Sequence, residues 1–171
     1  VMIRLLTGST HTGKTLLAQR LLERHGAPYL SIDHLKMGLI RSGMCPLTPE
    51  SPDEALTAVL WPVVREIVKT AVENGQSLTV EGCYIPFNWR EDFDASYLPH
   101  IRFLCLVFSE AYIRTRFDAI QTHANAIERR KDDSFCTMEL LLAENRRNLE
   151  ACRRRGLPYY LIDGPMPVSY T

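Results

Sequence analysis

The strongest constraint on this chain is a short segment near its start, Gly8-Ser9-Thr10-His11-Thr12-Gly13-Lys14-Thr15. It fits the pattern GxxxxGK[ST] at every fixed position, after an apolar run and before a segment with helical spacing. Glycines in such a loop let the backbone wrap around phosphate oxygens, while consecutive N–H groups and the helix start supply a positive field. We therefore expect all eight residues to border bound phosphates, with Lys14 on the outer phosphates and the Thr15 hydroxyl on Mg²⁺.

The rest of the chain alternates apolar runs of strand length with segments of helical spacing. The runs cover residues 2–7, 28–32, 77–80, 101–108 and 159–162, and the helical segments cover 14–25, 35–42, 53–74, 110–127 and 137–155. Strands that alternate with helices predict βαβ units with right-handed crossovers. The expected fold is a three-layer α/β structure, a five-stranded parallel sheet with helices on both faces. Three prolines predict a loop at 45–52, and Trp61-Pro62 predicts a kink or restart in the third helical segment.

Composition excludes several classes of function. With 171 residues, the chain has room for one domain but not for a second of ordinary size. Its formal net charge of zero provides no global field toward nucleic acid or an anionic membrane. Five scattered cysteines without metal-ligand spacing are typical of reduced thiols, and we find neither an export signal nor an apolar run long enough to span a bilayer. We expect a cytoplasmic protein without nucleic-acid or membrane partners.

A GxxxxGK[ST] loop in a chain this short resembles the small P-loop kinases, the group that includes adenylate kinase, shikimate kinase and gluconate kinase. The resemblance implies one P-loop NTPase domain over residues 1–171, with an acceptor-binding segment at about 34–75 and a short lid at about 114–136. It also implies ATP and Mg²⁺ as cofactors. An NKxD motif, which Ras-type GTPases use to recognise the base, is absent from the sequence.

Residues 31–43, SIDHLKMGLIRSG, resemble the adenylate kinase segment that runs STGDMLR and then KSG. Carried over by position, Asp33 takes the place of the acidic residue, and Lys36 takes that of an arginine that grips the acceptor phosphate. Asp33 also resembles the acid that faces an acceptor hydroxyl in shikimate kinase and zeta-toxin-like kinases. A carboxylate there could accept the hydroxyl proton. The alternative is that Asp33 only caps the following helix.

Glu81 closes the third predicted strand, where adenylate kinase-like enzymes carry Asp-Gly. We expect it beside Lys14 and Thr15, holding either a water of the Mg²⁺ shell or the acceptor. The aromatic-rich segment 83–90 follows. It could wall the acceptor pocket, with Arg90 reaching an anionic group, or it could be core plus loop.

Arginines concentrate after the fourth predicted strand. Arg114, Arg116 and the ERRKDD run at 128–133, which includes Arg130, resemble the adenylate kinase lid, whose arginines clamp the transferring phosphoryl group. Arg146 and Arg147 on the next helical segment are candidates for a further arginine, and the choice among them stays open.

These patterns together predict an enzyme that transfers the γ-phosphoryl of ATP to a small acceptor. Lys14, Asp33, Glu81 and Arg130 are the predicted catalytic residues. A hydroxyl acceptor is favoured, because Lys36 and Glu81 depart from the adenylate kinase pattern, and Asp33 could serve as its base. The alternative acceptor is a nucleoside monophosphate, held by Lys36, Arg41 and Arg90. A third interpretation is a non-catalytic nucleotide-binding regulatory module. The expected partners are a nucleotide and a small acceptor, and the expected assembly is a monomer or homodimer.

Overall fold

The computed structural model describes residues 1–123 and 136–164. Their strands form one parallel sheet in the order β2-β3-β1-β4-β5. The strands are β1 (Ile3–Gly8), β2 (Tyr29–Ser31), β3 (Leu78–Glu81), β4 (Ile101–Phe108) and β5 (Tyr159–Ile162). All five predicted strands are confirmed, the last two with the predicted bounds. Because β1 lies between β3 and β4, it is the central strand, and the loop that follows it begins at the centre of the sheet's carboxyl edge.

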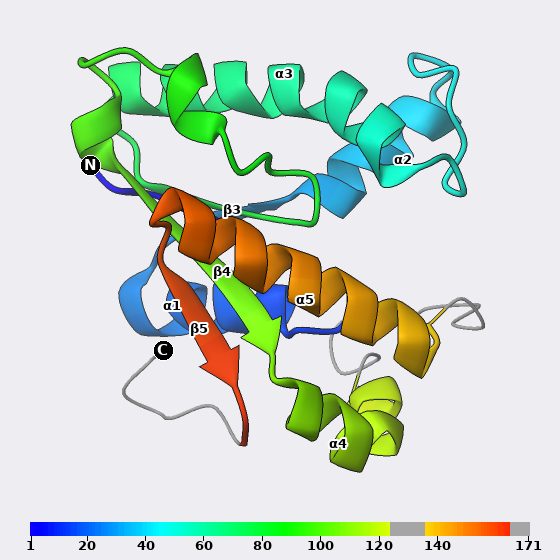
Figure 1. Cartoon of the computed structure of the whole chain (residues 1–171). Coiled ribbons are helices and arrows are strands. Elements are labelled where there is room, and N and C mark those ends of the chain that lie inside the picture. Colours follow the sequence, from blue (N-terminus) through cyan, green and yellow to red (C-terminus); the bar gives the residue numbers. More distant parts are fainter. Residues whose placement is uncertain (124–135, 165–171) are drawn as a thin grey trace.

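Helices cover both faces of this sheet. They are α1 (Lys14–His25), α2 (Ile32–Arg41), α3 (Asp53–Glu73), α4 (Glu110–His123) and α5 (Met138–Arg155), with short 3-10 turns η1 (Trp89–Asp92) and η2 (Leu98–His100). Figure 1 shows α3 on one side of the sheet, α1 on the other, and α5 running across β4. The described residues therefore form the predicted three-layer α/β fold. None of their helices is long and apolar enough to cross a membrane.

Alternate residues of the strands supply two separate cores. Ile3 and Leu5 of β1 point into the larger core, where α3 contributes Leu60, Val64 and Val68. Leu6, the next residue after Leu5, points to the opposite face and belongs to the second core, where α1 contributes Leu17, α4 contributes Ile113 and α5 contributes Leu141. This alternation is what a strand buried on both faces requires. It fixes the register that carries Gly8, Ser31 and Glu81 to one edge of the sheet.

The predicted interruption at Pro62 is wrong, because α3 runs as one helix of 21 residues through this proline. A proline inside a helix removes one backbone hydrogen bond and crowds the preceding turn. Here Leu60, Trp61 and Val64 on either side of it are buried in the larger core. Burial of these side chains offsets the local cost, so the helix continues.

The start of α2 also differs from the prediction. The helix begins at Ile32 instead of Leu35, and Ser31 occupies the N-cap position. Asp33 therefore lies inside the first helical turn and is not the cap, so the prediction that it only caps the helix is wrong. An acid in the first turn still interacts favourably with the helix dipole. The proline-rich stretch 45–52 is a loop between α2 and α3, as predicted.

Candidate active site

The GxxxxGK[ST] loop joins β1 to α1 and is shaped by its two glycines. Gly8 has a φ of 145°, and a Cβ atom there would lie 2.5 Å from the backbone oxygen of Leu106 in β4. Only a residue without a side chain lets the loop pass this close to its neighbouring strand. Gly13 has a φ of 85° and occupies the N-cap position of α1. The turn before the helix is thus left-handed, which aims the first N–H groups of α1 at the loop.

Hydrogen bonds inside the loop converge on the backbone oxygen of Ser9. The ammonium of Lys14 donates to it at 2.7 Å, and the hydroxyl of Thr12 donates to it at 2.9 Å. Lys14 is 7% exposed, although it carries a charge. An ammonium has three donors, so it can hold Ser9 and a phosphate oxygen at the same time. The Lys14 side chain is therefore held over the loop, where it was predicted to act.

Glu81 lies at the carboxyl end of β3 and joins this group, as the sequence predicts. The Thr15 hydroxyl donates to Glu81 Oε1 at 3.1 Å, and Glu81 is 1% exposed. Burial raises the pKa of the Glu81 carboxyl above its ordinary value, while the nearby Lys14 charge and the Thr15 hydrogen bond act in the opposite direction. The carboxylate is thus held beside both functional residues of the loop.

This pair of oxygen donors fits Mg²⁺. A hydroxyl and a carboxylate at hydrogen-bond distance are hard ligands, the kind that Mg²⁺ prefers when it keeps water and phosphate oxygens in its shell. Within residues 1–123 and 136–164, no three His, Cys, Asp or Glu side chains form a cluster able to hold a metal alone. Thr15 and Glu81 would accordingly hold the ion together with nucleotide phosphates.

Asp33, Lys36 and Tyr84 form a second group at the same edge of the sheet. The Lys36 ammonium lies 3.2 Å from Asp33 Oδ1, donates to the Tyr84 hydroxyl at 3.0 Å and lies over the Tyr84 ring. Burial alone would lower the pKa of Lys36, but Asp33 and Tyr84 together raise it above the ordinary value. Burial raises the pKa of Tyr84 to about 12. The lysine is therefore charged and already paired.

Helix α5 supplies two residues that the sequence analysis did not select. Glu144 is partly buried, and burial together with the Asp53 charge raises its pKa, while Arg147 and Lys14 act in the opposite direction. Asn145 is 2% exposed and donates to the hydroxyl of Ser9 at 2.8 Å. The signal for Asn145 is present in the sequence. It is the polar member of an otherwise apolar helical stripe that includes Leu141 and Leu149.

Arg41 and Arg90, the other cations predicted to bind the acceptor, do not form one cluster with Asp33. Arg41 is the last residue of α2, eight residues beyond Asp33 and thus about 12 Å along the helix. Arg90 lies over the ring of Trp89, which stacks on Phe103 in the first half of β4. Both arginines are exposed. Their predicted contact with the acceptor stays a prediction.

The arginines predicted for the lid are described only in part. Arg114 pairs with Glu110 at 2.9 Å on α4, and Arg146 reaches the same carboxylate at 3.4 Å. Arg116 has φ −125° and ψ 20°, a local departure from helical geometry inside α4. Arg130 lies outside the described residues. Its predicted catalytic role stays a prediction.

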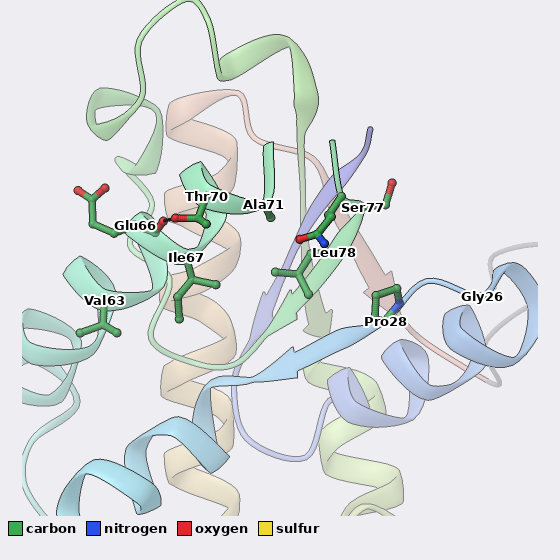
Figure 2. Close-up of a pocket in the computed structure, with 10 residues that line it drawn as sticks. Gly26, Pro28, Val63, Glu66, Ile67, Thr70, Ala71, Ser77 and Leu78 are labelled. Carbon is green, nitrogen blue, oxygen red and sulfur yellow. Dashed lines mark hydrogen bonds between the residues drawn. The ribbon is translucent and has the colours of Figure 1, made fainter. Parts of the chain in front are cut away.

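A groove of about 860 Å³ lies elsewhere in the structure, between α3 and the edge of the sheet (Figure 2). Pro28, which lines the groove, directly precedes β2, and Leu78, which also lines it, is the first residue of β3. The groove therefore lies at the amino ends of these strands. The P-loop and Glu81 lie at the carboxyl ends. Ligands of open parallel sheets bind beyond the carboxyl ends of the strands. The groove is therefore separate from the candidate active site.

No family model matches this sequence, and no curated protein matches it. Several solved structures have a fold similar to that of this chain. A gluconokinase from Sinorhizobium meliloti 1021 matches with a TM-score of 0.55 and 17% identity, over 99% of this chain and 86% of its own. A shikimate kinase from Bacteroides thetaiotaomicron matches with a TM-score of 0.56 and 12% identity, over 94% and 85%. A deoxyadenosine kinase from M. mycoides matches with a TM-score of 0.58 and 11% identity, over 99% and 94%. This chain has the three-layer fold of the small P-loop kinases.

Proposed function

We propose that this protein is an ATP-dependent phosphotransferase that moves the γ-phosphoryl group to a hydroxyl of a small molecule. The observation that carries the proposal is the convergence of three groups at one edge of the sheet. They are the P-loop with its buried Lys14, the Thr15–Glu81 pair, and the Asp33 carboxylate. A nucleotide switch needs the first two, but it has no use for a carboxylate and an aromatic hydroxyl placed beside them.

In the proposed reaction, the acceptor oxygen forms a bond to the γ-phosphorus while the bond from this phosphorus to the β,γ-bridging oxygen breaks, and ADP leaves. Asp33 accepts the proton of the acceptor hydroxyl. Lys14 stabilises the negative charge that spreads over the phosphoryl oxygens in the transition state. Thr15 and Glu81 would hold Mg²⁺, which supplies further positive charge at the phosphates. Arginines of the predicted lid, Arg130 among them, are proposed to complete this clamp.

The pairing of Lys36 favours a hydroxyl over a phosphate as the accepting group. An acceptor phosphate carries two negative charges and needs several cations around it. Lys36 already shares its charge with Asp33 and its hydrogen bond with Tyr84. Arg41 lies about 12 Å from Asp33 along α2. A neutral hydroxyl needs only a proton acceptor, and Asp33 provides one.

The names of the structural neighbours point to small-molecule acceptors of different kinds. They specify gluconate, shikimate and deoxyadenosine kinases. No ring system or charge is common to all three acceptors, because gluconate and shikimate carry a carboxylate and deoxyadenosine does not, so the fold itself does not select among them. We infer that the side chains around Asp33, Lys36 and Tyr84 make the selection in this protein.

Thermal unfolding with added ligands tests the proposal. We expect Mg²⁺-ATP to raise the unfolding temperature, because a ligand at a hundred times its Kd stabilises the folded state by about 2.7 kcal/mol. Sugar acids, shikimate-like acids, nucleosides and nucleoside monophosphates are then added in turn, and ADP formation is measured for each. A hydroxyl compound should add to the shift and increase ADP formation. A nucleoside monophosphate as the only active acceptor would contradict the hydroxyl assignment, and ATP binding without any transfer would favour a regulatory nucleotide-binding module.

Replacing Glu81 by Gln should distinguish the binding of Mg²⁺ from the binding of ATP. We expect Glu81→Gln to keep the shift produced by ATP in EDTA and to lose the additional shift produced by Mg²⁺. The same titrations on wild-type protein provide the reference. Retention of the full Mg²⁺ effect in the variant would remove Glu81 from the metal site.

The stability of the ligand-free variant provides an independent check on the burial of Glu81. Because burial raises its pKa, this carboxyl stabilises the fold in its protonated form, below the ordinary pKa of a glutamate. That contribution is lost as the pH rises through the raised value. Gln carries no charge, so at neutral pH Glu81→Gln should unfold at the same temperature as wild type or higher. A lower unfolding temperature would show that the Glu81 carboxylate stabilises the fold.

A further inference from the structure

Asn145 is a buried polar residue in the middle of α5, and it connects three parts of the chain. Its Nδ2 donates to the Ser9 hydroxyl at 2.8 Å and to the backbone oxygen of Leu141 at 2.8 Å. Its Oδ1 accepts the N–H of Phe108, the last residue of β4, at 2.8 Å. An asparagine amide has two N–H donors and one carbonyl acceptor, and all three groups are used.

These contacts join the end of β4 and the P-loop to α5. A helix of 18 residues does not need a side-chain amide at its centre, and Leu141 and Leu149, four residues before and after Asn145, are apolar residues of the cores. A buried amide costs free energy unless its hydrogen bonds are complete. The amide at this position is therefore explained by the groups that it binds. One of them is Ser9 of the P-loop, and another is Phe108 of the strand beside it.

Ser9 is the residue of the P-loop on which this contact acts. Its hydroxyl is held by Asn145, and its backbone oxygen accepts from both Lys14 and Thr12. A change in the position of Ser9 therefore moves the oxygen to which the Lys14 ammonium is bound. Phe108, the second partner of Asn145, lies two residues after Leu106, whose backbone oxygen limits the space at Gly8. Asn145 thus holds the loop directly at Ser9, and through Phe108 it holds the end of the strand that borders Gly8.

We propose that Asn145 is a positioning residue of the nucleotide site, which holds the P-loop in the conformation that binds phosphates. The inference rests on the proposed function, because it assumes that the loop binds ATP. It assigns to α5 a role in nucleotide affinity in addition to its role in the core. Loss of the amide leaves the Phe108 N–H without its acceptor and releases Ser9, so the loop samples other conformations before it binds.

The test compares Asn145→Ala with a control variant in the same helix. Thr137→Ala removes the hydroxyl that accepts the N–H of Leu140 at the start of α5. A lost N-cap lowers the stability of a protein and here leaves the P-loop contacts intact. We expect both variants to lower the urea midpoint of unfolding. Only Asn145→Ala should weaken ATP binding, by about tenfold, as measured by calorimetric titration.

A double-mutant cycle with Ser9→Ala identifies the contact responsible. If Asn145 acts through the Ser9 hydroxyl, the two substitutions together should weaken ATP binding by less than the product of their separate effects. Should Asn145→Ala fail to fold, Ser9→Ala removes the same hydrogen bond from the loop side, and unchanged ATP affinity in that variant would overturn the inference.

The outcomes for the inference and for the proposed function are distinguishable. If wild-type protein does not bind ATP, both are wrong. If wild type binds ATP and Asn145→Ala binds it within about twofold of wild type, while its stability falls as in Thr137→Ala, only the inference is wrong. Asn145 is then a structural residue of the core.

Discussion

Lys14→Ala should abolish catalysis and almost all binding of ATP. The Lys14 ammonium is buried, donates to the backbone oxygen of Ser9 at 2.7 Å and lies close enough to Glu81 for its charge to oppose the rise that burial causes in the pKa of that carboxyl. Alanine removes the cation that would balance the phosphate charge and leaves the buried Glu81 carboxylate without it. Removal of one preorganised charge-stabilising group costs an enzyme about two to three powers of ten in rate. We expect kcat/KM to fall by about a thousandfold, together with loss of the ATP-induced thermal shift.

Lys69→Ala is the matched control, because it removes a partly exposed lysine of α3 that pairs with the exposed Glu66 and takes no part in the candidate site. A surface ion pair contributes little to stability, so this variant should bind ATP and turn over as wild type does. Circular dichroism of both variants should be measured to test whether they are folded. Normal ATP binding and turnover in Lys14→Ala would contradict the assignment of the P-loop as the nucleotide site, and with it the proposed function.

Asp33→Asn should reduce turnover strongly and leave nucleotide binding in place. The amide is nearly the same size as the carboxylate, but it cannot accept the proton of an acceptor hydroxyl. General base catalysis contributes about two to four powers of ten, so kcat should fall by about a hundredfold or more. The Kd for ATP should stay within about threefold of wild type, because Asp33 is on α2 and outside the P-loop. Single-turnover phosphoryl transfer and ATP titration measure the two quantities separately.

The pairing of Asp33 with Lys36 requires a second variant. Asp33→Asn also breaks the 3.2 Å ion pair, so a loss of activity could come from a displaced lysine. Lys36→Gln breaks the same pair from the other side and keeps the carboxylate. If Asp33 is the base, Lys36→Gln should raise KM for the acceptor while kcat stays within about tenfold of wild type. Equal losses of kcat in the two variants would show that the ion pair, and not proton transfer, is what the reaction requires.

The sheet and its helices were largely predictable because their signals are local. Continuous apolar runs indicated all five strands, and β4 and β5 have the predicted bounds. Gly26 and Gly156, both left-handed with φ near 65°, end α1 and α5 where the sequence suggested. The prediction was wrong at Pro62, because the local cost of a proline was outweighed by the packing of α3 against the sheet, which depends on residues far away in the chain.

The candidate site also has parts that the sequence predicted and parts that it did not. The place of the P-loop between a strand and a helix was predicted correctly, since its eight consecutive residues carry the pattern. That the loop binds phosphates stays a prediction. The contact between Thr15 and Glu81 followed from strand order, because parallel strands bring their carboxyl ends to one edge. The pairing of Lys36 with Tyr84 did not follow, because these residues are 48 positions apart and only the packed fold sets their separation.

The sequence by itself determined the class of fold and the place of the GxxxxGK[ST] loop between a strand and a helix, because strand length, helix ends and the loop pattern all act between near neighbours. Only the tertiary structure decided which charges are paired and which polar groups are buried together. The contact of Asn145 with Ser9 joins residues 136 positions apart. A side-chain amide on a helix gives no local sign of such a partner, because its hydrogen bonds are chosen when the helix packs against the loop.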